Sequence, residues 1–438
     1  MENSVDTVII GSGISGLSAA HFLSKKNNDF LVLESNNQVG GIIKGKIEKE
    51  FICENGPNTV LLNNEAIKEI IKDCGLWDEL QFPKDSSNQN RFVLHKNKLT
   101  KIPINPVSFI ITPLLSMKSK LKILLEPFMS KHKENTSVFE FISKRFGKEF
   151  HDKLIVPFIT GIYAGNTKKM SAKHTLKILW NLEQSHGSIL KGILKSKNNK
   201  KIKSFNFPKG LNQLTSKIAL KLIDKIKFNF VVTQILKTEL GYEIKSKSSS
   251  IFCKNIISTL PAYNLKKIIS DEYLVSELDK IIYSPVDVFH FGFLKNNIKN
   301  QTQGFGVLTK PSDNKNFLGI LFNSRIFDYV SPKDKELFTV LVGGERQKEL
   351  CELDPQRLKK IVLLELENLI SHSGPIVFEN HFRWNNGIPQ FNLDNEKLID
   401  AIECFEKNNL GIRILGNFFN GVSVSDCIQK SKDVVNSI

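Results

Sequence analysis

The hydrophobic pattern at the start of the chain predicts a strand, a helix and a second strand. Residues 5–10 (VDTVII) are a short apolar run of the kind that forms a buried strand. The segment SGLSAAHFLSKK continues as a helix, and FLVLE predicts the next strand, which ends at Glu34. This order is typical of an α/β fold, in which a helix connects neighbouring parallel strands.

The turn between this strand and the helix has the pattern GxGxxG and comprises Gly11, Ser12, Gly13, Ile14, Ser15 and Gly16. Its first glycine permits a tight turn, its second lets a pyrophosphate approach the backbone, and its third lets the helix pack on the strand. The helix N-terminus offers N–H groups to phosphate, and Glu34 is placed to accept hydrogen bonds from a ribose. A chance glycine-rich turn is the alternative, but the strand, glycines, helix and acid together favour a dinucleotide site.

Later turns indicate that the dinucleotide is FAD. An acid followed within several residues by a glycine pair resembles the continuation found in flavoproteins, and the turn ENGPNTV follows at residues 54–60. In this region we expect cofactor contacts from Glu34, Ser35, Gly40, Gly41, Ile42, Gly56, Pro57, Asn58 and Thr59.

These pieces resemble the glutathione-reductase-like flavoprotein fold, a Rossmann-like α/β fold in which a C-terminal strand and helix return to the first domain. The resemblance implies a backbone contact with adenine at Val232, in a strand VVTQI, and contacts at Gly416, Asn417, Val422, Ser423 and Val424. Taken alone, Val232 is equally a core valine, and the late glycines are an ordinary strand-to-helix loop.

The rest of the pattern divides the chain into five stretches. Alternating segments such as VDVFHFGFL and FTVLVGG predict a mixed sheet that either walls a hydrophobic substrate or forms only a core. KGILKSKNNKKIKS predicts a basic linker at 191–204. We expect a cofactor domain from residues 1–90, 205–262 and 410–438, an inserted helical domain at 91–204 and a substrate domain at 263–409.

Within the helical domain, residues 104–130 combine apolar positions with Lys118, Lys120 and Lys122. Prolines interrupt the apolar run, so a membrane-spanning helix is not expected. Two interpretations stay open: peripheral contact with a bilayer surface, or a helix packed on its own domain with solvated lysines.

Composition narrows the partners and the compartment. The formal net charge is +16, but no nucleic-acid-binding motif accompanies it, so we expect no nucleic acid partner. The six cysteines form no CxxC pair and do not cluster with histidines, so neither a disulfide framework nor a metal site is expected. The acidic start MENSVD does not resemble a signal peptide, and we expect a cytoplasmic protein, with peripheral contact to the cytoplasmic membrane face as the open alternative.

The absence of a second GxGxxG and of a redox cysteine pair narrows the chemistry. With no NAD(P) domain of the disulfide-reductase kind, the flavin must take hydride directly from the substrate and pass electrons to oxygen or another acceptor. The chain is therefore predicted to be an oxidase or a desaturase.

Several internal segments resemble the protoporphyrinogen and coproporphyrinogen oxidase family. PFITGIYAGNTKKMS (157–171) is close to a family motif, and NRFVLHKNKLTKIP, GFGVL, LGILFNSRIF and WNNGIPQF resemble the family in order and spacing. The resemblance covers nearly the whole chain and implies an FAD enzyme of haem biosynthesis that oxidises a porphyrinogen, with oxygen as the usual acceptor and hydrogen peroxide as product.

The resemblance also implies roles for single residues. Arg91 matches an arginine that pairs with a substrate propionate, and a surface arginine is the alternative. Trp384 matches an aromatic residue that borders the flavin, and a core tryptophan is the alternative. The other matched positions at the substrate are Gly161, Gly165, Leu308, Leu321 and Leu341.

Two positions depart from the family pattern. Leu341 stands where some members have phenylalanine, so aromatic stacking is lost there, and Ile42–Ile43 stand where members often have an aromatic or basic residue. No side chain is assigned as a general base, because proton loss from the substrate does not require one.

The sequence favours protoporphyrinogen IX as substrate, with coproporphyrinogen III as the alternative. A flavin amine oxidase, a carotenoid desaturase and a non-catalytic porphyrin carrier are the rival functions. A homodimer is compatible with the sequence, which gives no indication of oligomeric state.

Overall fold

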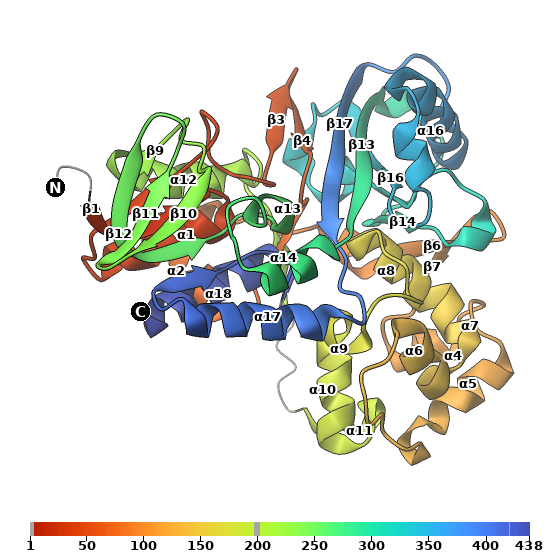
Figure 1. Ribbon diagram of the computed structural model, residues 1–438. Helices are drawn as coiled ribbons and strands as arrows, with labels where there is room; N and C mark the ends of the chain where they lie inside the picture. Colours follow the sequence, from red (N-terminus) through yellow and green to blue (C-terminus); the bar gives the residue numbers. More distant parts are fainter. Residues whose placement is uncertain (1–3, 197–201, 420) are drawn as a thin grey trace.

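The computed structural model describes residues 4–196, 202–419 and 421–438, and in them two large sheets lie side by side above a group of helices (Figure 1). The first sheet is built from both ends of the chain. Its main path runs β10 (Gln234–Thr238), β11 (Gly241–Lys245), β12 (Ser250–Ser258), β1 (Ser4–Ile10), β2 (Phe30–Leu33) and β9 (Ile226–Lys227), and β18 (Ile412–Ile414) pairs with β12.

The strands at the centre of the first sheet are parallel. β1 pairs in parallel with β2 and with β12, and β12 pairs in parallel with β18. The carboxyl ends of β1 and β18, the first and last strands of the chain, therefore lie at the same edge of the sheet, with β12 between them.

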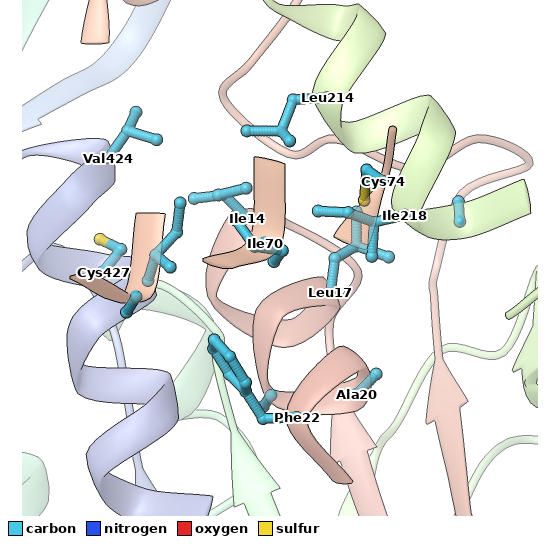
Figure 2. Packing of buried hydrophobic residues seen from close by; sticks show 14 of the residues in the cluster. Ile14, Leu17, Ala20, Phe22, Ile70, Cys74, Leu214, Ile218, Val424 and Cys427 are labelled. Atoms are coloured by element: carbon cyan, nitrogen blue, oxygen red, sulfur yellow. The ribbon is translucent and has the colours of Figure 1, made fainter. Parts of the chain in front are cut away.

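Helices cover both faces of this sheet. α1 (Ile14–Lys25), α2 (Glu65–Asp73), α12 (Asn212–Lys221) and α18 (Val424–Ser437) share one hydrophobic core, and Figure 2 shows Ile14, Leu17, Ile70, Ile218 and Val424 in it. α13 (Ala262–Leu265), α14 (Glu272–Asp279) and α17 (Asn395–Asn408) pack on the other face. Neighbouring residues of β1 contribute to opposite cores, Ile9 to the first and Ile10 to the second, as a strand buried on both faces requires.

The second sheet has the order β17 (Phe378–Pro389), β13 (Tyr283–Leu294), β16 (Lys335–Gly343), β15 (Gly319–Leu321), β14 (Gly306–Leu308), β6 (Arg91–His95) and β7 (Lys98–Lys101). α16 (Pro355–Ile370) covers one of its faces, where apolar residues such as Phe291 and Phe338 pack. Two short antiparallel pairs, the hairpin of β3 (Gly45–Glu48) with β4 (Phe51–Glu54) and the distant pair β5 (Val60–Leu61) with β8 (Ser204–Phe205), complete the strands that the described ranges contain.

The helical part begins later than we expected. Residues 91–101, which the predicted boundary places in the helical domain, form β6 and β7, because β6 pairs in parallel with the distant β14. The helices that follow are α4 (Pro106–Ile111), α5 (Met117–Leu124), α6 (Val138–Phe146), α7 (Lys148–Phe150), the π-helix His151–Ile155, α8 (Val156–Tyr163), α9 (Ala172–Thr175), α10 (Lys177–His186) and α11 (Ile189–Lys195).

The predicted basic linker at 191–204 is wrong at its start. Residues 191–195 belong to α11, whose N-terminus is capped by the Ser188 side chain, and Ser204 lies in β8. Residues 197–201 lie outside the described residues. No helix among the described residues is both long enough and apolar enough to cross a membrane.

Candidate functional site

The GxGxxG turn connects β1 to α1 at the carboxyl edge of the first sheet. Gly11 has φ +101°, a conformation that favours glycine, and a Cβ on Gly16 would lie 1.9 Å from the Gly11 carbonyl oxygen. The tight turn and the close helix–strand packing expected from the sequence are therefore both present.

The glycine pair at residues 40–41 meets this turn. The Gly40 N–H donates to the Ser12 carbonyl over 3.0 Å, and a Cβ on Gly41 would lie only 3.0 Å from the Gly13 Cα. Two backbone segments without side chains thus lie together at the N-terminus of α1. This is the kind of cradle in which a pyrophosphate can contact backbone directly.

Glu34 follows β2 and lies beside the same turn. One of its carboxylate oxygens accepts from the Ser12 backbone N–H (3.0 Å) and hydroxyl (2.6 Å), and the other accepts from Asn36. Burial alone would raise the pKa of Glu34, but these hydrogen bonds outweigh burial and hold the pKa below its usual range. Two of the donors are rotatable side chains, so ribose hydroxyls could replace them without loss of hydrogen bonds. Ser35, also predicted at this site, places its hydroxyl 3.3 Å from the carboxylate.

The C-terminal turn lies next to the N-terminal one. The Leu415 N–H donates to the Ser258 carbonyl over 2.7 Å, and Ser258 is also opposite Ile10 at the end of β1. Gly416, Asn417, Val422 and Ser423 then lead into α18, whose first residue is Val424. Further along the helix, the Ser431 hydroxyl donates to the Ser15 carbonyl of α1 over 2.9 Å.

The N-terminus of α1 suits a phosphate. No side chain caps it, and its first turn contains no acidic residue. The positive end of the helix dipole and the first-turn N–H groups therefore face the glycine cradle without competition from a carboxylate.

Val232 does not lie in a strand, contrary to the prediction. β10 begins at Gln234, and the backbone before it turns to donate from Phe230 N–H to the Glu34 carbonyl over 2.8 Å. Val232 is half-buried in the second core of the first sheet, close in the chain to this contact with Glu34.

The turn at residues 54–59 joins the first sheet to the second. The Asn55 side-chain oxygen accepts from Asn380, and its backbone oxygen accepts from the Trp384 indole N–H over 2.6 Å. The Asn58 side chain accepts from Asn323 over 3.2 Å. Within the same turn, a Cβ on Gly56 would lie 2.1 Å from the Ile42 carbonyl oxygen, and Pro57 and Thr59 are half-buried.

The second sheet places the predicted substrate residues on one face. Leu308 lies opposite Gly319, Gly319 opposite Leu341, and Leu341 opposite Val288, so these residues form one row across four strands. Residues that are paired in register point to the same side of a sheet.

A second row on this face contains Arg91. Arg91 lies opposite Gly306, Gly306 opposite Leu321, and Leu321 opposite Thr339, which is itself opposite His290. These positions are two residues from the first row and so share its face. Trp384, opposite Val286, belongs to this face as well, and α16 covers the other one.

Arg91 and Trp384 are held by aromatic and polar contacts. The Arg91 guanidinium lies 4.5 Å from the centroid of the Phe305 ring, and no carboxylate pairs with it in the described residues. The Trp384 ring packs against Phe382 at 4.7 Å, and the Lys44 ammonium lies 5.6 Å from it. Arg91 is thus available to an anionic ligand.

The two predicted glycines of the helical motif lie in different surroundings. A Cβ on Gly161 would lie 2.4 Å from the Leu308 side chain, so α8 and the substrate face touch at this point. A Cβ on Gly165 would lie 2.4 Å from the Met170 sulfur and 2.5 Å from the Gln390 amide oxygen. Gly165 therefore allows close packing of the loop, away from the row that contains Leu308.

Four residues at the junction with the turn at residues 54–59 were not predicted as site residues, namely Glu54, His290, Asn323 and Asn380. His290 is completely buried, and burial lowers its pKa to about 3. The Glu54 carbonyl has a smaller effect in the opposite direction, so the His290 ring is neutral. A histidine in the apolar strand VDVFHFGFL was the available signal, but only the pairing register shows which face it occupies. In the described residues no cluster of three His, Cys, Asp or Glu side chains could hold a metal ion.

Comparison with known proteins gives full-length matches. The profile of the family described as flavin containing amine oxidoreductase matches residues 14–395. Protoporphyrinogen oxidase 2, chloroplastic/mitochondrial, of Arabidopsis thaliana is 29% identical over 98% of this chain and 93% of its own length. Coproporphyrinogen III oxidase of Bacillus subtilis (strain 168) is 24% identical over 98% of this chain and 96% of its own.

A solved structure also matches the whole chain. The protein of Exiguobacterium sp. 255-15, provisionally described as a protoporphyrinogen oxidase, has a TM-score of 0.85 at 20% identity, with 100% of this chain and 98% of that chain covered. The predicted fold class and the predicted resemblance to porphyrinogen oxidases are confirmed by these matches.

Proposed function

The chain belongs to the family of flavin-containing amine oxidoreductases, and on that premise we propose that it is an FAD-dependent oxidase that converts a porphyrinogen to the porphyrin. Six hydrogens leave the substrate in three two-electron steps, and three molecules of oxygen become hydrogen peroxide. Bound FAD would supply the two-electron acceptor for hydride from a meso carbon. The glycine cradle at Gly13 and Gly41, the uncapped α1 N-terminus and ionised Glu34 fit the phosphates and ribose of this cofactor.

The chain's own residues bind and orient the substrate. Arg91 pairs with a propionate, because a planar guanidinium donates two parallel hydrogen bonds to a carboxylate. Leu308, Leu321 and Leu341 provide the apolar surface that excludes water and contacts the pyrrole rings. We assign no side chain as a general base.

The observation that supports this proposal most strongly is the register of the second sheet. Five residues from five different strands share the face that meets the turn at 54–58, although they are spread over nearly 300 positions of the chain. They are Arg91, Leu308, Leu321, Leu341 and Trp384. A cation at one side of an apolar face is what a carboxylate-bearing tetrapyrrole needs.

The test is anaerobic addition of a porphyrinogen to the FAD-loaded protein. We expect loss of the oxidised-flavin absorption, its return with oxygen, and the formation of fluorescent porphyrin and peroxide. Porphyrin binding without loss of flavin absorption would show a carrier instead. Turnover of amines or phytoene without turnover of porphyrinogen would show one of the rival oxidoreductases.

We propose protoporphyrinogen IX as the preferred substrate. The Arabidopsis relative named for this activity is 29% identical and the Bacillus relative named for coproporphyrinogen III is 24% identical. The measurement is kcat/KM for both porphyrinogens under the same conditions. Equal values, or a higher value for coproporphyrinogen III, would contradict this preference.

We also propose that the helical part contacts an anionic membrane surface. Nine large apolar side chains among residues 104–128 are 55–84% exposed, including Val107, Ile110 and Ile111 of α4 and Leu121 and Leu124 of α5. The lysines Lys118, Lys120 and Lys122 lie between them and pair with no described carboxylate, whereas the acid of this segment, Glu126, is buried against Arg145. Exposed apolar groups with unpaired cations suit the interface of an anionic bilayer.

Sedimentation with lipid vesicles tests this surface. We expect binding to vesicles that contain phosphatidylglycerol, weaker binding to phosphatidylcholine alone, and loss of binding in the double variant Ile110→Glu, Ile111→Glu. The matched control is Leu240→Glu with Leu410→Glu, which changes two residues that are 81% and 79% exposed beside strands of the first sheet. Concentration-dependent dimerisation without vesicle binding would assign the surface to a second copy of the chain.

A further inference from the structure

Glu54 is a buried carboxyl group at the junction between the two sheets. It ends β4 and lies opposite Gly45 of β3, and only 4% of the residue is exposed. One carboxylate oxygen accepts from the Leu211 N–H over 2.7 Å and from the Asn206 amide over 3.1 Å. These contacts hold the side chain in one place between β4 and the segment that precedes α12.

The second oxygen of Glu54 has no hydrogen-bond partner in the described residues. No lysine, arginine or histidine forms an ion pair with this carboxyl group there either. The group also lines a small cavity together with Asn58, Thr59 and Phe305. A negative charge at this position would be buried without a compensating cation, which is costly.

The titratable side chains close to Glu54 do not supply a charge near neutral pH. His290 of β13 is neutral, burial raises the pKa of Cys53 in β4 to about 12, and burial raises the pKa of Tyr329, whose buried hydroxyl also lacks a partner. Burial raises the pKa of Glu54 itself to about 7, against smaller opposing effects of the hydrogen bonds from Leu211 and Asn206.

The position of Glu54 connects it to the cofactor turns. β4 leads directly into Gly56–Thr59, and its partner β3 follows the Gly40–Gly41 turn after three residues. A dinucleotide held between these turns would bring phosphate charge towards the hairpin and would remove water from it. Both effects disfavour an ionised carboxyl group nearby.

We propose that Glu54 couples FAD binding to the uptake of a proton, so that the protein with a neutral Glu54 binds FAD more tightly than the protein with an ionised Glu54. The inference rests on the proposed function, because it takes FAD as the ligand. By thermodynamic linkage, FAD binding stabilises the protonated carboxyl group by the same free energy by which protonation strengthens FAD binding. The dissociation constant then rises by up to about tenfold for each pH unit above the pKa of Glu54.

The test is calorimetric titration of cofactor-free protein with FAD between about pH 6 and pH 8.5, in buffers of different ionisation enthalpy. We expect a dissociation constant that rises above neutral pH, with uptake of close to one proton per FAD at about pH 8. The Glu54→Gln variant, which keeps the shape but cannot titrate, should bind FAD without this proton and with a weaker dependence on pH than the unmodified protein.

Two comparisons isolate the effect of Glu54. Burial lowers the pKa of Lys430 in α18 to about 8, so this group titrates in the same range. Only the part of the pH dependence that Glu54→Gln removes therefore belongs to Glu54. Glu277→Gln is the matched control, because Glu277 is 5% exposed but is paired with Lys280. This control should keep the pH dependence of the unmodified protein.

The outcomes separate this inference from the proposed function. FAD binding with a constant affinity and no proton uptake would overturn the role of Glu54 and leave the proposed function intact. A Glu54→Gln variant with the unmodified pH dependence would do the same. If that variant does not fold, the proton count of Lys430→Gln decides, because an unchanged count leaves Glu54 as the group that takes up the proton and a lost proton overturns its role. No FAD binding at any pH would overturn both.

Discussion

The substrate proposal depends most directly on Arg91. We expect Arg91→Met to lower kcat/KM for the porphyrinogen by roughly 10- to 100-fold, since a hydrogen bond between charged groups contributes about 1.5–3 kcal/mol. Arg91→Lys keeps the charge but not the planar pair of donors, and should recover only part of the loss. Porphyrin fluorescence gives the rates, and Arg357→Met, at an exposed position of α16, is the control. An undiminished rate in Arg91→Met would contradict the propionate contact.

Glu54 should also make the stability of the cofactor-free protein depend on pH. Its pKa is about 7 in the folded protein against a usual value of 4.5, so the folded state binds more protons than the unfolded state between these values. The free energy of unfolding therefore falls as pH rises through this window, by roughly 3 kcal/mol in total for this one group.

Urea unfolding of the cofactor-free protein at several pH values measures this effect. Glu54→Gln should lose the part of the decline between about pH 5 and pH 7 that the unmodified protein shows. The same decline in both proteins would show that other groups cause it.

Single residues were predictable where a motif has a local cause. Gly11, Gly13, Gly16 and Glu34 follow from a strand, a turn and a helix that are consecutive in the chain. His290 and Asn380 were not predictable, because their place between the sheets depends on pairing between strands β13, β16 and β17. Nothing within each segment indicates which face of the sheet meets the turn at 54–58.

At the scale of elements, the contact of α1 with β1 depends on the absence of a side chain at Gly16. Gly16→Ala places a methyl group against the Gly11 carbonyl, so the helix must move away from the strand. We expect a loss of about 1–3 kcal/mol in stability and at least a tenfold loss in FAD affinity, because the helix N-terminus moves with it.

Thermal unfolding and flavin fluorescence measure these two effects of Gly16→Ala. Gly187→Ala is the control, since Gly187 ends α10 with φ +70° and no atom lies within 4 Å of an added Cβ. It should lose only about 1–2 kcal/mol from backbone strain and keep its FAD affinity. Equal loss of FAD affinity in the two variants would contradict the role of the turn.

The helices and strands whose bounds were predicted wrongly depend on contacts with distant parts of the chain. Residues 91–101 were assigned to the helical part because that part follows in sequence, but β6 pairs with β14 about 200 residues later. The segment before β10 has the composition of a strand, yet the N–H groups of Asn229 and Phe230 donate to the carbonyls of Asn36 and Glu34, and regular pairing with β11 begins only at Gln234. α11 starts at Ile189 and extends into the predicted linker because Ser188 caps it and Gly192 packs against Leu182 of α10. Local patterns in the sequence indicate which segments form helices or strands. They do not indicate which distant segments pair with one another.

At the scale of the whole molecule, side-chain hydrogen bonds join the turn that follows β4 to the part of the protein that contains the second sheet. Asn380 and Asn323 of that part donate to Asn55 and Asn58 of the turn, and Trp384 donates to Asn55. The proposed cofactor turns and the proposed substrate face therefore meet through directed hydrogen bonds. Such contacts fix the relative position of the two sites more narrowly than apolar packing alone.

The two ends of the chain should act together on the cofactor. Ser431 of α18 donates to the Ser15 carbonyl at the start of α1, although the two residues are 416 positions apart. A larger side chain at this buried position would push α18 away from the glycine turn. We expect Ser431→Leu to weaken FAD binding about as strongly as Gly13→Val, although one change lies at each end of the chain.

Thermal shift with added FAD tests this coupling. A ligand at 100 times its dissociation constant stabilises the protein that binds it by about 2.7 kcal/mol, so the unmodified protein should unfold at a clearly higher temperature with FAD. Ser431→Leu and Gly13→Val should both lose this shift, whereas Ser437→Leu, at the exposed end of the same helix, should keep it. A normal shift in Ser431→Leu would mean that α18 does not help to form the cofactor site, and the role of the C-terminal turn would have to be abandoned even if the N-terminal turn binds FAD.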